Sequence, residues 1–170
     1  SRIVVLGSGG FIGTHLCERL KLIAPDTEIV GRALPALDLT VGEHADRLAN
    51  LFTPDTAVIS LAAIKRQMGD TLDSFTANLK ISTNLARLLA RHPVASFIYL
   101  SSAAVYGEET TDTRITEDTA PRAGSYYGMA KLASELLLRK AAEQNGRTSL
   151  LCVRPPLIYG PGDQGGYGPT

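Results

Sequence analysis

The chain has 170 residues, of which 44% are hydrophobic and 20% are charged, as expected for one globular domain with a substantial core. The 17 basic and 17 acidic residues give a formal net charge of zero without a basic stripe, so nucleic acid is not expected as a partner. No apolar run approaches the roughly 20 residues that span a bilayer, so no membrane association is expected.

The chain begins with a predicted strand, a glycine turn and a helix. Arg2 to Leu6 is a short apolar run, which is typical of a strand buried on both faces. Pro25 and Asp26 end the helix that follows. Apolar residues recur at helical spacing within it, at Ile12, Leu16, Leu20 and Ile23.

Two short strands are predicted next, at residues 28–30 and 37–39. Thr40 is expected to cap a helix over residues 41–52, because its hydroxyl can accept a hydrogen bond from the first helical turn. Residues 57–61 form the fourth predicted strand.

The second half of the chain continues the alternation of strands and helices. A long helix over residues 72–90 ends before Pro93, and residues 96–100 form the fifth predicted strand. Residues 107–124 are polar and rich in turn residues, which predicts a surface loop.

A last helix is predicted over residues 126–144, with Leu132, Ala133 and Leu136 facing inward. Asn145 and Gly146 end it. Residues 149–153 then form the sixth strand. Strands that alternate with helices and are apolar on both faces predict an α/β fold with a doubly wound parallel sheet.

The most informative residues all fall at one edge of this predicted sheet. Gly7, Ala62, Ser101 and Pro155 each lie at or just after the carboxyl end of a predicted strand. Ligands of such sheets bind beyond the carboxyl ends of the strands. We therefore expect the functional site at this edge.

Gly7, Gly10 and Gly13 form a glycine turn between the first strand and the first helix, with Phe11 and Ile12 inside it. Glycine lets the backbone adopt positive φ and approach a phosphate closely, and the helix N-terminus offers free N–H groups. The pattern therefore indicates a dinucleotide-binding loop. The alternative is a tight turn that serves only the close packing of the helix on the strand.

Tyr127 and Lys131 lie four residues apart and share one face of the predicted helix. A free phenol has a pKa of about 10, and a nearby ammonium lowers that pKa. The pair is thus suited to general acid–base chemistry. The alternative is an exposed Tyr–Lys pair on a solvated helix, because this spacing is common by chance.

Further candidates lie at the strand ends and in the long helix. Ser101 and Ser102 end the fifth strand. Their hydroxyls either donate a hydrogen bond to the same substrate oxygen as Tyr127 or only cap the end of the strand. Asn78 is a polar residue in a half-buried helical stripe, with a structural role as its alternative. Lys65 either reaches a phosphate or a ribose or points into solvent.

Cys17 and Cys152 each lie inside an apolar pattern. Buried thiols are therefore expected, with a disulfide or a metal site as the alternative. Together with three scattered histidines they do not form a metal-binding cluster, so no metal is expected. Two unpaired cysteines indicate the reducing cytoplasm as the compartment.

Five motifs occur in a fixed order along the chain: Gly7 to Gly13, Leu61-Ala62-Ala63, Ser101 to Gly107, Tyr127 to Lys131 and Arg154 to Gly162. In this order they resemble the extended short-chain dehydrogenases, the NAD(P)-dependent epimerase/dehydratase family that acts mostly on nucleotide sugars. The resemblance covers the whole chain. It implies a Rossmann fold and reversible hydride transfer.

The resemblance implies a role for each matching residue. Ser102 matches the catalytic hydroxyl and Tyr127 the acid–base group, while Lys131 matches the lysine that binds the nicotinamide ribose and tunes the tyrosine. Asn78 matches an asparagine that supports this lysine through water. Other residues expected to contact the cofactor are Gly7, Gly10, Phe11, Ile12, Gly13, Arg32, Asp38 (near the adenine), Leu39, Leu61, Ala62, Ala63, Lys65 and Pro155.

Two departures from the family pattern narrow the expectation. Ala103 and Ala104 follow Ser102 where 4,6-dehydratases carry an acidic pair, so a dehydratase is disfavoured. Gly31 and Arg32 end the second strand where NAD-preferring members often carry an acidic residue, which favours NADP slightly over NAD.

The sequence thus predicts an NAD(P)-dependent epimerase or reductase of a nucleotide sugar, and the resemblance implies a homodimer paired through the helices that carry Asn78 and Tyr127. A carbonyl reductase of a non-sugar substrate and a non-catalytic NAD(P)-binding sensor are the alternatives. Residues 1–155 are expected to form the cofactor-binding domain. Residues 156–170 are expected to begin a substrate-binding region, in a fragment of a longer protein.

Overall fold

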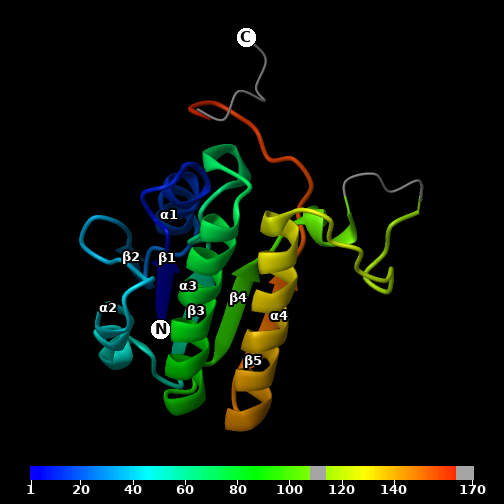
Figure 1. The fold of residues 1–170 in the computed structure, drawn as a ribbon. Helices are drawn as coiled ribbons and strands as arrows, with labels where there is room; N and C mark the ends of the chain where they lie inside the picture. Colours follow the sequence, from blue (N-terminus) through cyan, green and yellow to red (C-terminus); the bar gives the residue numbers. More distant parts are fainter. Residues whose placement is uncertain (108–113, 164–170) are drawn as a thin grey trace.

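A computed structural model describes residues 1–107 and 114–163 (Figure 1). Parts of the predicted loop at 107–124 and of the region at 156–170 therefore lie outside the described residues. The strands are β1 (Arg2–Leu6), β2 (Glu28–Arg32), β3 (Thr56–Ser60), β4 (Ser96–Leu100) and β5 (Ser149–Val153). The α-helices are α1 (Phe11–Ile23), α2 (Gly42–Asp46), α3 (Leu72–Arg91) and α4 (Tyr126–Asn145), and the 3-10 helices are η1 (Ala49–Leu51), η2 (Arg66–Met68) and η3 (Ala103–Tyr106).

The five strands form one parallel sheet in the order β2-β1-β3-β4-β5. The chain passes from β1 to β2 in one direction and from β3 to β5 in the other. Since crossovers between parallel strands are right-handed, α1 covers one face of the sheet and α3 and α4 cover the other. The predicted doubly wound parallel sheet is confirmed, and its order reverses beside β1, where β1 ends in the glycine turn.

The strand predicted at residues 37–39 is wrong. Leu37 and Leu39 are buried in the core, but the backbone between them turns and joins no strand. The Asp38 carboxylate accepts hydrogen bonds from the backbone N–H and the hydroxyl of Thr40, at 2.9 and 2.7 Å. Because β1 already has a strand on each side, no free edge next to it was left for a third partner.

The helix predicted over residues 41–52 is shorter than expected, and Thr40 does not cap it. Helix α2 covers only five residues and begins after Val41, whose side chain makes no capping hydrogen bond. The 3-10 helix η1 follows at Ala49–Leu51. Thr40 is instead committed to Asp38, so its hydroxyl is a donor inside the preceding turn rather than an acceptor for the helix.

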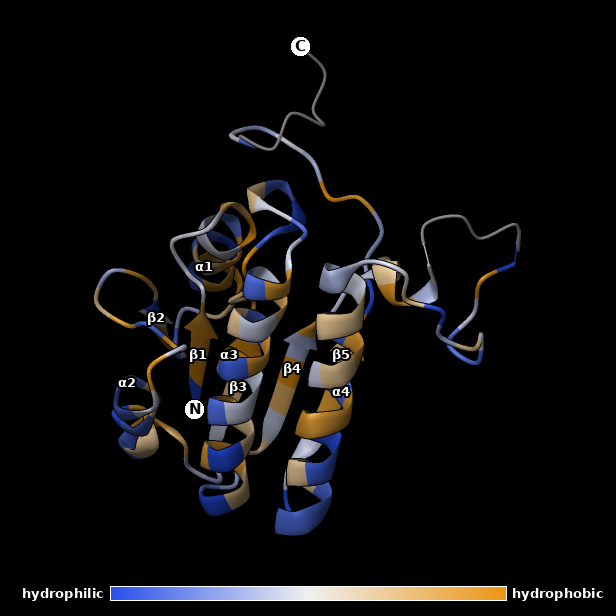
Figure 2. Cartoon of the chain, in the orientation of Figure 1, coloured by the Kyte–Doolittle hydropathy of each residue, from blue (hydrophilic) through white to orange (hydrophobic). Residues whose placement is uncertain are grey.

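Helices α3 and α4 lie side by side over the sheet and bury the main core beneath them (Figure 1). Hydrophobic and hydrophilic residues alternate along each helix, and β1 behind them is mostly hydrophobic (Figure 2). The core unites strand and helix side chains, with Phe97 of β4, Leu85 of α3 and Leu138 of α4 among them. Burial of such side chains contributes roughly 1.5–3 kcal/mol each.

One predicted face of α4 is wrong. Leu132 and Ala133 are half-buried, but Leu136 is 59% exposed. The buried face instead carries Lys131, Ser134, Glu135 and Leu138. Small and polar residues on this face allow α3 to approach closely. The prediction selected the face by hydrophobicity alone and therefore placed Leu136 inside.

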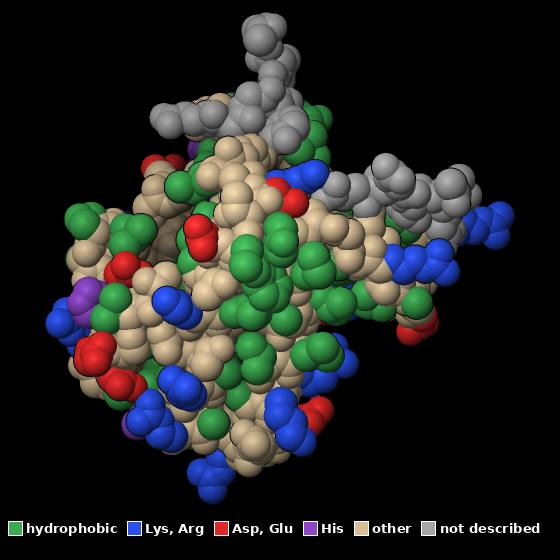
Figure 3. Space-filling view, viewed as in Figure 1, with side chains coloured by type: hydrophobic (Ala, Val, Ile, Leu, Met, Phe, Trp, Pro, Cys, Tyr) green, Lys and Arg blue, Asp and Glu red, His purple; other side chains and the backbone are tan. Residues whose placement is uncertain are grey.

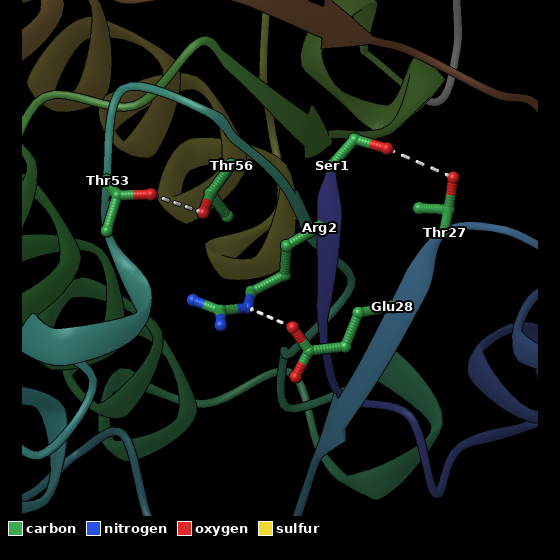
Figure 4. A network of polar contacts seen from close by, with 6 residues as sticks. All are labelled: Ser1, Arg2, Thr27, Glu28, Thr53 and Thr56. Carbon is green, nitrogen blue, oxygen red and sulfur yellow. Dashed lines mark hydrogen bonds and ion pairs between the residues drawn. The ribbon is translucent and has the colours of Figure 1, made fainter.

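The opposite edge of the sheet, at the amino ends of the strands, is held by short polar contacts (Figure 4). Arg2 of β1 donates to the Glu28 carboxylate of β2 at 2.8 Å, and Ser1 contacts Thr27 at 3.2 Å. These groups are exposed, so their contribution to stability is small. Among the residues that the structure describes, no helix is both long and apolar enough to cross a membrane.

Candidate active site

The glycine turn after β1 has no room for a side chain at Gly7 or Gly13. Gly7 adopts a φ of +86°, and a Cβ atom there would lie 2.9 Å from the backbone nitrogen of Ala62. A Cβ atom at Gly13 would lie only 2.2 Å from the Gly7 carbonyl oxygen. The turn therefore brings α1, β1 and the segment after β3 into direct backbone contact, which only glycine allows.

The first turn of α1 faces this glycine turn with its N–H groups. Gly10 is the N-cap residue and supplies no side chain to accept a hydrogen bond from that turn, and its own N–H donates to the Gly7 carbonyl at 3.1 Å. The first turn also carries no acidic residue. A helix start of this kind attracts an anion such as a phosphate, through its N–H groups and the helix dipole.

Helix α4 begins in close contact with η3, and this contact places Tyr127 beside Ser102. Ser125 caps α4 by accepting a hydrogen bond from the Gly128 N–H at 3.1 Å. A Cβ atom at Gly128 would lie 2.5 Å from the Ala104 carbonyl oxygen, so the helix could not pack this closely with a larger residue. The Ser102 hydroxyl accepts a hydrogen bond from the Ala104 N–H at 3.2 Å and lies near enough to the Tyr127 phenol to lower its pKa.

Lys131 is buried beneath Tyr127, with 4% of its surface exposed. Its ammonium donates to the Leu100 carbonyl at 2.7 Å, at the end of β4. The ammonium also lies 4.9 Å from the centre of the Tyr99 ring and 5.6 Å from that of Tyr127. Burial lowers the pKa of Lys131 to about 8, although the Glu135 carboxylate opposes the change.

The pKa of Tyr127 differs from the sequence-based expectation. Burial raises the pKa of the phenol, and the nearby Ser102 hydroxyl only partly opposes this. The expected lowering by Lys131 is therefore not what the structure gives. At neutral pH the site holds a protonated phenol next to a lysine that is still mostly charged.

Asn78 lies in α3 but does not contact Lys131 directly. Its amide nitrogen donates to the Ile64 carbonyl at 3.0 Å, and its amide oxygen accepts from the Ile64 N–H at 2.9 Å. The side chain is buried and holds the segment that follows β3 against α3. Through Ile64, Asn78 fixes the backbone between Ala63 and Lys65, two of the predicted site residues.

These groups line a single cavity of about 660 Å³ at the carboxyl ends of the strands. It reaches from the glycine turn to Tyr127, so a ligand in it would touch both. The predicted site residues that line it are Gly7, Gly10, Phe11, Ile12, Gly13, Leu61, Ala63, Lys65, Ser102, Tyr127, Lys131 and Pro155.

Five predicted site residues do not line this cavity. Asn78 has been described, and Ala62 lies directly beneath Gly7. Leu39 is buried in the core. Asp38 is held by Thr40, and this hydrogen bonding lowers the pKa of its carboxyl group. Arg32 is exposed and bonds the carbonyl of Gly31 at 2.9 Å.

Sequence reasoning missed several groups around the site. The Asp70 carboxylate accepts a hydrogen bond from the Tyr127 N–H at 2.8 Å, at the start of α4. Residues 156–158, after β5, line the cavity opposite α1, together with Asp163. Residues 156–158 belong to the motif Arg154 to Gly162, but no role in the site was assigned to them, and nothing in the sequence pattern marks Asp70 or Asp163.

A buried ion pair next to the site was also missed. Glu135 and Arg154 are joined by two hydrogen bonds, at 3.0 and 2.7 Å. A third nitrogen of Arg154 donates to the Tyr106 hydroxyl at 2.8 Å. Glu135 follows Lys131 by one helical turn, so the regular spacing of charged residues on α4 was a usable signal.

Residues 3–169 match the model of the "NAD dependent epimerase/dehydratase family". The UDP-glucose 4-epimerase of Pisum sativum is 31% identical over 179 residues, covering 88% of this chain and 51% of that protein. The chain spans about half the length of the curated relatives it matches.

Two solved structures share the fold and part of the sequence. The UDP-glucose 4-epimerase of Thermus thermophilus in complex with NAD has a TM-score of 0.77 and 27% identity, and the match covers 91% of this chain and 54% of that one. RMD from Pseudomonas aeruginosa complexed with NADPH has a TM-score of 0.81 and 27% identity, with 96% and 57% covered.

Proposed function

Because the chain belongs to the NAD-dependent epimerase/dehydratase family, we propose that it supplies the cofactor site and the reacting groups of an NAD(P)-dependent epimerase or reductase of nucleotide sugars. The observation that carries this proposal is the single cavity that joins the glycine turn to Ser102, Tyr127 and Lys131. A binding module without chemistry has no need for a phenol, a hydroxyl and a buried ammonium in one place.

The glycine turn fits a dinucleotide. Glycine at positions 7 and 13 keeps the turn tight, since a Cβ atom at either would collide with backbone atoms, and the first turn of α1 offers N–H groups without an acidic neighbour. The turn would hold the pyrophosphate, while Lys131 would hold the ribose at the other end of the cavity. When bound, the nicotinamide ring supplies a reversible acceptor of hydride.

The three reacting groups divide the proton chemistry among them. The Tyr127 phenol gives a proton to the substrate oxygen or takes one from it. Ser102 lies beside that phenol and lines the same cavity, so its hydroxyl would orient the substrate oxygen. The Lys131 ammonium, fixed by the Leu100 carbonyl, favours the phenolate whenever the proton leaves.

We also propose a modest preference for NADP over NAD. The end of β2 lacks a carboxylate at Gly31, where a Cβ atom would lie 2.8 Å from the Ser8 hydroxyl, and the exposed Arg32 guanidinium follows it. A guanidinium can pair with a 2′-phosphate through two hydrogen bonds. Calorimetric titration with both cofactors tests this. Binding of NAD tenfold tighter than NADP, about 1.4 kcal/mol, and unchanged in Arg32→Ala, would overturn it.

The proposed assembly is a homodimer paired through α3 and α4. Hydrophobic side chains gather over these two helices on the face shown in Figure 3. Exposed apolar residues on them include Leu72, Met129, Leu136 and Leu137. Residues 1–155 would then form the cofactor-binding domain and residues 156–170 the start of the substrate-binding region. A cytoplasmic location stays a prediction.

The substrate class is tested by nicotinamide turnover of the protein against a panel of nucleotide sugars and a matched panel of simple ketones. The proposal expects turnover with at least one nucleotide sugar and little with the ketones. Turnover confined to the ketones would favour the carbonyl reductase. Cofactor binding without turnover of either panel would favour the non-catalytic sensor.

A further inference from the structure

The Glu135–Arg154 pair is the most deeply buried ion pair among the residues that the structure describes. Glu135 is 1% exposed, and the side chain of Arg154 is 19% exposed. Both carboxylate oxygens are bonded, one to Nε at 3.0 Å and the other to a terminal nitrogen at 2.7 Å. Such paired hydrogen bonds between charged groups are strong and fix the geometry of both side chains.

The pair joins three segments that build the candidate active site. Glu135 follows Lys131 by one turn of α4, so both side chains lie on the same helix face. Arg154 follows β5 and bonds the hydroxyl of Tyr106, at the end of η3. The next residue, Pro155, lines the cavity and accepts a hydrogen bond from the Ala103 N–H at 2.8 Å, beside Ser102.

Around Lys131, Tyr99, Tyr127 and Cys152 are neutral near pH 7, whereas Glu135, Arg139 and Arg154 are charged, as are Lys65, Arg66 and Asp163 in the lining of the cavity. Burial raises the pKa of Tyr99 and of Tyr127, and it raises that of Cys152 to about 11. The buried polar side chains of α3, Asn78 and Ser82, are uncharged. The titratable and charged groups that face this region are Tyr99 of β4, Tyr106 of η3, Tyr127, Glu135 and Arg139 of α4, Cys152 of β5, and Arg154.

The charge of the Glu135 carboxylate, one helical turn after Lys131, opposes the effect of burial on the pKa of Lys131. Arg154 occupies both oxygens of this carboxylate. As a result, the Glu135 charge attracts the Lys131 ammonium, but both carboxylate oxygens are hydrogen-bonded to Arg154 and not to Lys131. The ammonium stays on the Leu100 carbonyl, next to the cavity.

We propose that Glu135 and Arg154 are positioning residues of the site: Glu135 keeps Lys131 charged, and Arg154 limits that attraction and fixes the segment next to Ser102. Neither residue touches the reacting atoms in this account. The consequence for turnover rests on the proposed function, but the charge state of Lys131 can be measured without substrate or cofactor.

The test is a pH titration of the lysine side-chain carbon signals by NMR in the protein, with the Lys131 signal assigned by its loss in Lys131→Arg. Glu135→Gln keeps a hydrogen-bond acceptor for Arg154 but removes the charge, and should lower the pKa of Lys131 by about one unit. Arg154→Gln leaves the carboxylate unopposed and should raise the pKa of Lys131. These shifts have opposite signs, which a purely structural disturbance would not produce.

Glu143→Gln is the matched control, because it removes the same charge from an exposed position on α4. It should leave the pKa of Lys131 unchanged. Glu135→Asp keeps the charge but moves it farther from Lys131, so the pKa of Lys131 should lie between its values in the wild type and in Glu135→Gln. If Glu135→Gln does not fold by circular dichroism, Glu135→Asp decides.

Unchanged Lys131 pKa values in both Glu135→Gln and Arg154→Gln would overturn the proposal, and so would shifts of the same sign. Loss of epimerase or reductase activity has no bearing on this measurement. A protein that turned over no nucleotide sugar would contradict the proposed function and leave the proposed roles of Glu135 and Arg154 standing.

Discussion

Lys131 carries the largest electrostatic cost among the three reacting groups of the site. Its ammonium is almost fully buried, with one hydrogen bond to the Leu100 carbonyl and two aromatic rings nearby. Burial of a charge is unfavourable unless partners replace the lost water. The lowered pKa of about 8 shows that these partners compensate only in part.

This cost predicts how the stability of the chain depends on pH. A lysine in an unfolded chain has a pKa of about 10.4, whereas folded Lys131 has a pKa of about 8. Between these values the unfolded state binds the extra proton, so the free energy of unfolding rises with pH. Below pH 8 both states are charged, and the penalty of the buried ammonium is fully present.

Lys131→Met should therefore have a higher free energy of unfolding than the wild type at pH 7. This difference between variant and wild type should shrink by roughly 1–3 kcal/mol as the pH rises to 10. Urea denaturation at the two pH values measures this change. Lys140→Met, at an exposed position on the same helix, is the control and should show no pH-dependent difference. An equal difference for Lys131→Met at both pH values would contradict the account.

At the residue scale, spacing alone placed Tyr127 and Lys131 on one helix face, and the structure confirms that both line the cavity. Spacing does not give burial, because burial depends on what packs against the helix. The direction of the Tyr127 pKa was therefore wrong, and the Leu100 carbonyl partner of Lys131 was not foreseen.

At the scale of elements, the glycine turn and the first turn of α1 act as one unit. Gly7 and Gly13 approach one another and the segment after β3 so closely that their Cβ positions are occupied by backbone atoms. The turn therefore has one accessible shape. That shape sets where the N–H groups of α1 point, and hence where a phosphate can bind.

Gly13→Ala should weaken cofactor binding by at least about tenfold, because the new methyl group would lie 2.2 Å from the Gly7 carbonyl and force the turn to move. Gly124→Ala is a matched control, since no atom lies within 4 Å of its Cβ position. Calorimetry with the preferred cofactor measures both, and circular dichroism checks folding. Equal affinities for wild type and Gly13→Ala would refute the role given to the turn.

The regular elements were mostly predictable, because five apolar runs and two long helices have clear periods and clear ends. The errors fell where periodicity is weak. Residues 37–39 alternate like a strand, but no free edge next to β1 was available to pair with them. Thr40 reads as a helix cap, but a carboxylate two residues earlier competes for its hydroxyl.

At the scale of the whole molecule, exposed apolar residues gather over α3 and α4 (Figure 3). Large apolar surfaces on a folded protein commonly mark contacts with other chains. The resemblance implied pairing through these two helices, but the hydrophobic pattern placed Leu136 inside, so it did not predict which residues of α4 face outward. The chain also spans only about half of its curated relatives, so the substrate contacts of the whole protein stay a proposal.

Leu136→Glu should convert the proposed dimer to a monomer, because it places a charge in the middle of the exposed face of α4. Sedimentation equilibrium gives the mass directly. Leu22→Glu makes the same change at an exposed position on α1, outside this surface, and should leave the mass unaltered. A Leu136→Glu variant with the mass of the wild type would exclude pairing through this face.

The central claim is that Tyr127 exchanges the proton while the glycine turn holds the cofactor, and Tyr127→Phe tests it most directly. Turnover of a nucleotide sugar and cofactor affinity are measured on the same full-length protein, for the wild type and for the variant. The account predicts that turnover falls by about 10²–10⁴-fold while cofactor affinity stays nearly the same. Full turnover by Tyr127→Phe would contradict it.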